Sequence, residues 1–400
     1  MGKAQLHNFS DVRVKWAFIN RSKHIQLADR ISIRHLKEEL EHALFLKHGN
    51  SALHYLRGTN EYSERMFQED YLNSLREAPV VDWTLDVKNG QFDITVDGLW
   101  TDSTRCEIPV LKVVNALHTD YQWRQLTRAE RIQIRVEAYA RLRQKIAFLK
   151  LRPDITFTDF GNRRAASPEW HDEVIRILKE ELSPEQFLGT SNVYLAKKYD
   201  LMPSGTSAHE LYMVLSAFHE DLVQSQKAVL DMWWKENGHA LSIVLPDTYT
   251  TDLFLEKVIT PEQARLWKGS RQDSGDPIVY GEKWIAFYKH HDIDPRKKMI
   301  IFSDGLTIEE IVKIADHFKG RIRVTFGWGT NLTNDLPGFQ TVSIVMKPVE
   351  VVCMREGESY RVSLSKLSDN LAKATGHPDA IERDKHRAGI DVTYNVIPTY

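Results

Sequence analysis

The sequence contains little cysteine and no long apolar segment. Only two of its 400 residues are cysteines, Cys106 and Cys353, which are too few for a disulfide-stapled domain or for a zinc site made of several cysteines. No window approaches the roughly 18 consecutive apolar residues that a membrane helix needs, and the N-terminus has no apolar signal core. We therefore expect a soluble protein of the reducing cytoplasm that does not enter a membrane.

An excess of charge of either sign is also missing. The 53 lysines and arginines are balanced by 55 aspartates and glutamates, which gives a formal net charge of -2. Such a chain has no general electrostatic attraction to nucleic acid or to an acidic membrane surface. We expect no nucleic-acid partner, and we expect the substrates to be bound by local sites.

Two regions of different character divide the chain. Residues 1–150 contain strand-like segments, a hairpin signal at Asn89-Gly90 and a long helical region with a break near Leu126. This pattern predicts an α/β sandwich domain with bridging helices. Residues 347–400 return to short strands and polar turns, and we expect them to pack back on the first domain and complete it.

Residues 151–346 alternate short apolar runs with helical segments. Repeated strand–helix units of this length require a parallel sheet, and about six or seven of them favour a closed or nearly closed barrel. We therefore expect an irregular TIM-like α/β barrel in which the loops after the strands share one rim. The expected strands include residues 155–160, 187–189, 241–245, 299–302, 322–326 and 342–346.

Aspartates and glycines occur in turns beside several of these strands. Asp273 lies in one turn, Asp304 in a second, and Gly329 with Thr330 in a third. Carboxylates at strand ends suit a ribose diol or a magnesium ion, and glycines let backbone N–H groups approach a phosphate. The same residues are common turn formers, but their recurrence at several strand ends indicates an enzyme acting on a phosphorylated sugar.

Two further segments carry candidate chemistry. Arg163 and Arg164 follow the first barrel strand, where they suit binding of a phosphate or carboxylate, with a solvated surface pair as the alternative. Ser207 and Glu210 have the spacing of a capping box, which places His209 in a first helical turn. The positive end of a helix disfavours imidazolium, so His209 is expected to be neutral and nucleophilic there, although a structural role is the common alternative for a single histidine.

The ordered set of these segments resembles nicotinate phosphoribosyltransferase, of the type II phosphoribosyltransferase family. The resemblance rests on Asp159-Phe160-Gly161-x-Arg163-Arg164, Gly189-Thr190-Ser191-Asn192, Gly205-Thr206-Ser207-Ala208-His209-Glu210, Arg271-x-Asp273-Ser274-Gly275-Asp276-Pro277, Phe302-Ser303-Asp304 and Phe326-Gly327-x-Gly329-Thr330. Each segment is weak evidence alone, whereas their order and spacing as a set are highly specific.

The resemblance implies the reaction of nicotinate with phosphoribosyl pyrophosphate in NAD biosynthesis, giving nicotinate mononucleotide and pyrophosphate. It further implies ATP hydrolysis through a phosphohistidine at His209, Mg²⁺ at Asp273 or Asp304, and a homodimer with the active site at its interface. Phe160 would stack on the pyridine ring, and Gly329 and Thr330 would hold the 5′-phosphate. The implied catalytic residues are His209, Arg271, Asp273 and Asp304, and the implied substrate-binding residues are Phe160, Arg163, Thr190, Ser191, Gly305, Gly329 and Thr330.

Ser191 bears on the choice of substrate. Relatives that use nicotinamide carry an aspartate at this point, and such an anion about 4 Å from the carboxylate of nicotinate would cost up to about 4 kcal/mol at an effective dielectric near 20. A serine hydroxyl can donate a hydrogen bond instead. The sequence therefore predicts a preference for nicotinate over nicotinamide.

The N-terminus departs from the family pattern. Members usually begin with a Thr-Asp-x-Tyr-Lys segment before a helix containing Met-Gly, whereas this sequence starts at Met1-Gly2. Either the start lies further upstream, or the chain lacks a tyrosine expected to reach the neighbouring subunit's pyridine site. Loss of that tyrosine would raise the Michaelis constant. The alternatives to an active transferase are a weakened nucleotide-binding relative and a metal-dependent hydrolase, which would need histidines that converge at strand ends.

Overall fold

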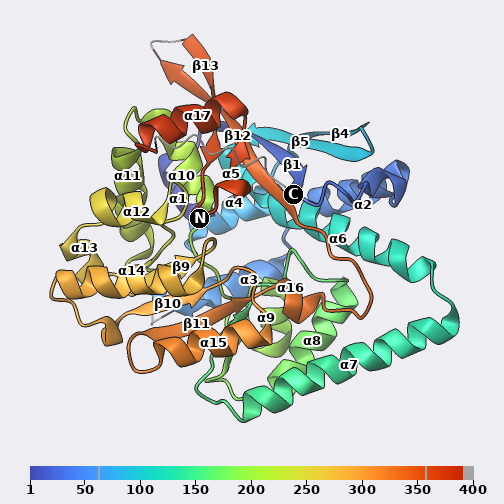
Figure 1. The fold of residues 1–400 in the computed structure, drawn as a ribbon. Coiled ribbons are helices and arrows are strands. Elements are labelled where there is room, and N and C mark those ends of the chain that lie inside the picture. Colours follow the sequence, from blue (N-terminus) through green and yellow to red (C-terminus); the bar gives the residue numbers. More distant parts are fainter. Residues whose placement is uncertain (62–63, 356–357, 391–400) are drawn as a thin grey trace.

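A computed structural model describes residues 1–61, 64–355 and 358–390, and it contains two principal sheets (Figure 1). One is a five-stranded antiparallel sheet, and the other is a six-stranded parallel sheet. None of the helices in the described ranges is long and apolar enough to cross a bilayer. The two expected kinds of α/β unit are therefore both present.

The antiparallel sheet joins the N-terminal part of the chain to the C-terminal tail. Its order is β13-β12-β1-β5-β4, and the buried face of β1 carries Val14, Trp16 and Phe18. Asn89 and Gly90 have φ values of 51° and 73° in the turn between β4 and β5, as a tight hairpin requires. The strands are β1 (Arg13–Asn20), β4 (Asp82–Lys88), β5 (Gln91–Leu99), β12 (Ile344–Arg355) and β13 (Glu358–Ser363). The predicted completion of the first domain by the tail is confirmed.

The parallel sheet has the order β7-β6-β11-β10-β9-β8, and its ladders are all parallel. Helices α8 (Pro168–Glu181), α14 (Pro277–His290) and α15 (Ile308–Phe318) separate successive strands and cover the outside of the sheet (Figure 1). The predicted α/β barrel is confirmed, and it is irregular because no ladder among the described residues joins β7 to β8. The strands are β6 (Phe157–Asp159), β7 (Phe187–Thr190), β8 (Ile243–Val244), β9 (Gly269–Gln272), β10 (Met299–Phe302) and β11 (Arg323–Trp328).

One expected barrel strand belongs to the other sheet. Residues 342–346 overlap the start of β12, which pairs antiparallel with β1 from Asn20↔Ile344 onward. A short apolar run does not specify its partner, because pairing depends on distant parts of the chain. The prediction for 342–346 was therefore wrong. The predicted domain boundaries stay predictions, and residues 391–400 of the expected tail lie outside the described residues.

Two long helices connect the units. Helix α6 (Glu107–Arg124) and helix α7 (Arg128–Lys150) are separated by Thr127, whose side chain forms a capping box with Glu130. The predicted break near Leu126 is therefore confirmed. One continuous cluster of buried side chains includes Trp16 and Trp100 of the antiparallel part and Phe157 and Trp328 of the barrel. This shared core fixes the two units against each other, so a site formed between them is preorganised.

Candidate functional site

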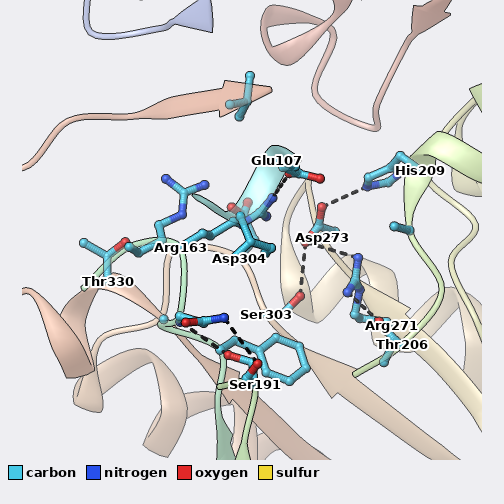
Figure 2. Close-up of a pocket in the computed structure, with 18 of the residues that line it drawn as sticks. Glu107, Arg163, Ser191, Thr206, His209, Arg271, Asp273, Ser303, Asp304 and Thr330 are labelled. Carbon is cyan, nitrogen blue, oxygen red and sulfur yellow. Dashed lines mark hydrogen bonds and ion pairs between the residues drawn. The ribbon is translucent and has the colours of Figure 1, made fainter. Parts of the chain in front are cut away.

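A cavity of about 510 Å³ lies where the barrel meets the antiparallel part of the structure (Figure 2). Its barrel wall is formed by residues that directly follow β6, β7, β9, β10 and β11, because the carboxyl ends of parallel strands share one rim. Ten of the eleven predicted site residues line this cavity: Phe160, Arg163, Ser191, His209, Arg271, Asp273, Asp304, Gly305, Gly329 and Thr330.

Thr190 is the predicted substrate residue that does not line the cavity. Its hydroxyl is fully buried and donates a hydrogen bond of 2.6 Å to Asp159 Oδ2, because successive residues of a strand point to opposite sides. Asp159 also accepts hydrogen bonds from the backbone N–H of Gly161 at 2.6 Å, and its Oδ2 lies 2.8 Å from His171 Nε2. The predicted ligand contact of Thr190 is therefore not supported, and Thr190 instead helps to hold the wall that carries Ser191.

Phe160 and Gly327 make a close approach in this wall. A Cβ atom on Gly327 would lie 2.4 Å from Phe160 Cδ2 and 2.5 Å from Cε2. The backbone N–H of Phe160 donates a 2.9 Å hydrogen bond to the carbonyl of Trp328. Only glycine at position 327 therefore lets the Phe160 ring pack this closely against β11 beside the cavity.

His209 begins helix α10 (His209–Leu215), as the predicted first-turn position requires. Its Nδ1 lies 2.9 Å from Thr248 Oγ1, and its Nε2 lies 2.9 Å from Asp273 Oδ2 (Figure 2). Burial, reinforced by the positive charge of Lys366, lowers the pKa of His209 to about 4. The imidazole is therefore neutral at pH 7, and burial is the largest cause.

The predicted capping box at this helix is absent. The N-cap is Ala208, without a side-chain cap, and Ser207 precedes it. Glu210 points instead toward the N-terminal part of the chain, where its Oε1 accepts hydrogen bonds from Gln5 Nε2 at 2.6 Å and Thr104 Oγ1 at 2.7 Å. Burial raises the pKa of Glu210 to about 7. Glu210, the residue next to His209, therefore links the two units by hydrogen bonds, which the spacing of Ser207 and Glu210 did not indicate.

Asp273 is surrounded by hydrogen-bond donors and positive charge. Its Oδ1 accepts a hydrogen bond from Ser303 Oγ at 3.2 Å and lies 3.8 Å from Arg271 Nη2. Burial opposes ionisation of this carboxyl, but Arg271 and His209 together hold its pKa well below the ordinary value. Arg271 also donates to Thr206 Oγ1 at 2.6 Å. A permanent carboxylate is therefore held beside His209 in the cavity.

Charged residues from outside the barrel complete the cavity, and the sequence interpretation did not include them. Glu107 forms an ion pair with Arg163 and lies 3.8 Å from Lys347 Nζ (Figure 2). Lys373 Nζ lies 2.6 Å from Asp304 Oδ2. These lysines come from the C-terminal tail, and isolated lysines in a polar segment carry no local signal of such a role.

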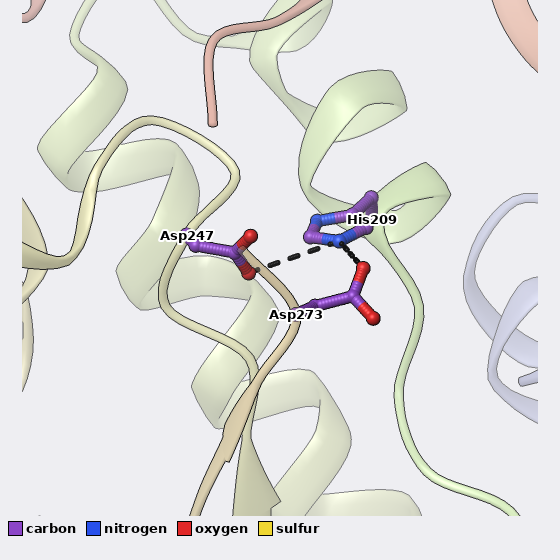
Figure 3. Close-up of side chains that lie close together, drawn as sticks. All are labelled: His209, Asp247 and Asp273. Carbon is purple, nitrogen blue, oxygen red and sulfur yellow. Dashed lines mark hydrogen bonds and ion pairs between the residues drawn. The ribbon is translucent and has the colours of Figure 1, made fainter. Parts of the chain in front are cut away.

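The described residues include one group with the spacing of metal ligands, and it differs from the predicted pair. His209, Asp247 and Asp273 each offer a ligand atom, and these atoms lie within 4.8 Å of one another (Figure 3). Asp304 is instead bonded to Lys373. The predicted Mg²⁺ position at Asp273 and Asp304 stays a prediction. An ion held by these two carboxylates alone fits poorly, because each has an ammonium group within 4.0 Å.

The fold and the cavity together define a class of protein. Arginines, carboxylates, glycine turns and a neutral histidine at the carboxyl rim of a parallel α/β barrel form an enzyme site for an anionic phosphorylated substrate. Comparison with models of known protein families supports this class. The model of the nicotinate phosphoribosyltransferase (NAPRTase) family matches residues 155–391, and the model of the nicotinate phosphoribosyltransferase N-terminal domain matches residues 1–115. The chain belongs to the nicotinate phosphoribosyltransferase family.

Solved structures of similar proteins extend this comparison over nearly the whole chain. A nicotinate phosphoribosyltransferase from Vibrio cholerae is 30% identical, with a TM-score of 0.84 over 98% of this chain and 91% of that one. One from Porphyromonas gingivalis is also 30% identical, with a TM-score of 0.84 over 97% and 96%. A putative nicotinate phosphoribosyltransferase from Saccharomyces cerevisiae is 27% identical, with a TM-score of 0.81 over 97% and 95%.

Proposed function

We propose that this chain performs the reaction of its family mainly by placing charge and aligning its two substrates. The enzyme joins nicotinate to phosphoribosyl pyrophosphate and yields nicotinate mononucleotide and pyrophosphate, a step of NAD biosynthesis. The observation that carries the proposal is the convergence of ten of the predicted residues on one cavity at the rim of the barrel. The cavity contains carboxylates, arginines and an aromatic wall together, as these substrates require.

In the proposed reaction, the ribosyl C1′ develops positive charge as its bond to the pyrophosphate oxygen breaks. The lone pair of the pyridine nitrogen then forms the new C–N bond, so no general base is needed. The carboxylates of Asp273 and Asp304 face the same cavity and suit stabilisation of this cation. Phe160 would align the pyridine ring by stacking, while Gly329 and Thr330 would hold the 5′-phosphate. Alignment of bound reactants can supply a large part of the rate enhancement.

ATP coupling through His209 is the second part of the proposal. A ring nitrogen of the neutral imidazole would attack the γ-phosphorus of ATP, the bond to the ADP oxygen would break, and ADP would leave. Water would later hydrolyse the phosphohistidine to free phosphate. The low pKa of His209 supports this role because the imidazole is neutral at pH 7 and one of its ring nitrogens is unprotonated. Mg²⁺, when bound together with the phosphate groups, would neutralise part of their charge.

Ser191 supports the proposed preference for nicotinate. It lies in the cavity wall beside Asn162, whose backbone N–H donates to Ser191 Oγ at 3.3 Å. The serine hydroxyl keeps its own proton for donation to a substrate carboxylate. A nicotinamide amide group gains less from this donor than a charged carboxylate, because hydrogen bonds to ionised acceptors are stronger.

A homodimer and a cytoplasmic location are also proposed. Exposed apolar side chains lie on β7, on helix α9 (Val193–Tyr199) and just after it, close in sequence to Ser191: Leu188, Val193, Tyr194 and Met202, with Tyr194 70% exposed. An apolar patch beside an active-site opening is typical of a subunit interface. Both cysteines are free and buried, as suits a reducing compartment. Sedimentation of Tyr194→Asp against the parent tests the dimer, and an unchanged dimer would contradict this choice of surface.

Two assays run in parallel test the proposed function. The parent and His209→Ala are incubated with γ-labelled ATP, and nicotinate mononucleotide formation from nicotinate and phosphoribosyl pyrophosphate is measured in both. We expect acid-labile label on the parent and none on the variant, with mononucleotide formed by the parent. Label that survives in the variant would place the phosphoryl group on another residue. Binding of both substrates without any product would instead indicate a nucleotide-binding relative.

A further inference from the structure

Lys366 lies at the centre of the His209, Asp247 and Asp273 group. It belongs to the short strand β14 (Ser365–Lys366) of the C-terminal tail, and its side chain is 7% exposed. Its Nζ lies 2.9 Å from His209 Nε2, 3.3 Å from Asp247 Oδ2 and 3.9 Å from Asp273 Oδ2. All three contacts are made with the group that has the spacing of metal ligands (Figure 3).

A divalent cation and this ammonium compete for the same space and for the same lone pair of His209 Nε2. Metal–ligand bonds to histidine nitrogen and carboxylate oxygen are about 2.0–2.2 Å long, so an ion bound by this group would lie in contact with Lys366 Nζ. The His209 Nε2 lone pair and Asp247 Oδ2 already face the ammonium, whereas Asp247 Oδ1, 3.8 Å from His209 Nε2, has no hydrogen-bond partner among the described residues. Asp247 Oδ2 also accepts a hydrogen bond of 2.6 Å from Ser274 Oγ.

The charges around this group are already balanced without a metal. Asp247 and Asp273 supply two negative charges, while Lys366 and the Arg271 guanidinium, 3.8 Å from Asp273, supply two positive ones. Magnesium sites depend on uncompensated oxygen ligands, usually carboxylates assisted by substrate phosphates. The protein alone therefore leaves no excess negative charge here to attract a divalent ion.

We propose that Lys366 is the resident cation of the His209, Asp247 and Asp273 group, so that the protein by itself binds no divalent metal there. The ammonium also faces His209, where an incoming phosphoryl group would be presented; this second statement rests on the proposed ATP reaction. Divalent ions would then enter the cavity only together with the phosphate groups of the substrates. This differs from the sequence-based expectation of a magnesium ion held by Asp273.

Manganese binding to the full-length protein without substrates tests the proposal. Free Mn²⁺ is measured by electron paramagnetic resonance during titration of the parent, Lys366→Met, Asp247→Asn, Lys366→Met/Asp247→Asn and Lys373→Met. We expect no stoichiometric binding by the parent and one Mn²⁺ per chain in Lys366→Met, at least about a hundredfold tighter, because removal of the ammonium ends a close cation–cation repulsion. The double variant should lose this ion, since it lacks a ligand.

Lys373→Met is the matched control. Lys373 comes from the same tail and lies in the same cavity, but its partner Asp304 does not belong to the three-ligand group. The control should therefore gain no ion. The proposal is overturned if the parent binds one Mn²⁺ that Asp247→Asn removes, or if folded Lys366→Met binds none. Should Lys366→Met fail to fold, the comparison of the parent with Asp247→Asn still decides the question. Mn²⁺ binding is measured without turnover, so a result that contradicts this proposal can be distinguished from failure of the proposed reaction.

Discussion

Replacement of Gly327 by alanine tests whether the Phe160 ring forms the wall of the pyridine site. The added methyl group would lie 2.4 Å from Phe160 Cδ2 and 2.9 Å from Cγ, whereas ordinary contacts begin at 3.4 Å. The ring must therefore shift by about 1 Å, since β11 is paired on both sides and its backbone is held. The ring is the part that yields, and it yields toward the cavity.

The expected size of the effect follows from what stacking contributes. Aromatic stacking is worth about 0.5–1.5 kcal/mol beyond burial, so its loss should raise the KM for nicotinate about two- to twelvefold. The KM for phosphoribosyl pyrophosphate should change little, because the altered wall faces the pyridine ring in the proposed arrangement. Overpacking should also destabilise the fold by about 1–3 kcal/mol, which appears as a lower Tm.

Initial rates measured below the unfolding temperature of the variant separate the change in KM from the loss of stability. Nicotinate is varied at saturating phosphoribosyl pyrophosphate, and phosphoribosyl pyrophosphate is then varied at saturating nicotinate. Gly205→Ala is the control, because Gly205 lines the same cavity and an added Cβ meets nothing within 4 Å. The reasoning is refuted if Gly327→Ala leaves the KM for nicotinate unchanged, or if both KM values rise equally.

Two further predictions concern charge. Ser191→Asp should lower kcat/KM for nicotinate by up to about a thousandfold, because two carboxylates about 4 Å apart repel by about 4 kcal/mol at an effective dielectric near 20. The neutral variant Ser191→Asn should lower kcat/KM far less. Equal kcat/KM values of the two variants would contradict this prediction. Glu210 has its pKa raised by burial from 4.5 to about 7, so the folded state retains a proton that the unfolded state loses in this window. Stability should therefore fall by up to about 3 kcal/mol as pH rises through the window, and Glu210→Gln, which keeps an acceptor oxygen, should flatten that decline. The Tm values of the parent and of Glu210→Gln at pH 5 and pH 8 measure this decline. An equal change of Tm in both proteins would contradict the assignment of the decline to Glu210.

The barrel side of the site was predictable from the sequence because its signals are local. Each functional segment there is a turn between a strand and a helix, and the carboxyl ends of parallel strands meet at one rim. The amino-acid sequence alone therefore predicts that Phe160, Asp273, Asp304 and Thr330 lie in one place. His209 does lie in the first turn of its helix, but the capping box from which this position was predicted is absent.

The errors also have physical causes. Residues 342–346 are apolar enough for either sheet, and only pairing with β1 decides between them. Thr190 and Ser191 are neighbours in sequence, but strand geometry turns one inward and the other into the cavity. The capping box failed because Glu210 has better partners in a distant part of the chain. For residues 342–346 and for Glu210 a long-range contact outweighed a local tendency, whereas for Thr190 the alternation of side chains along the strand decided the outcome.

The kind of fold, the order of its units and the loops that carry the chemistry can be predicted from the amino-acid sequence, because these depend on periodicity and turn residues within short windows. The pairing of charges in the cavity depends instead on how distant segments pack together. Glu107 from helix α6 pairs with Arg163, which lies 56 positions away. The tail lysines Lys366 and Lys373 meet Asp247 and Asp304 of the barrel at separations of 119 and 69 positions. Such pairing depends on the packing of the tail over the barrel, and no local pattern in the chain encodes it.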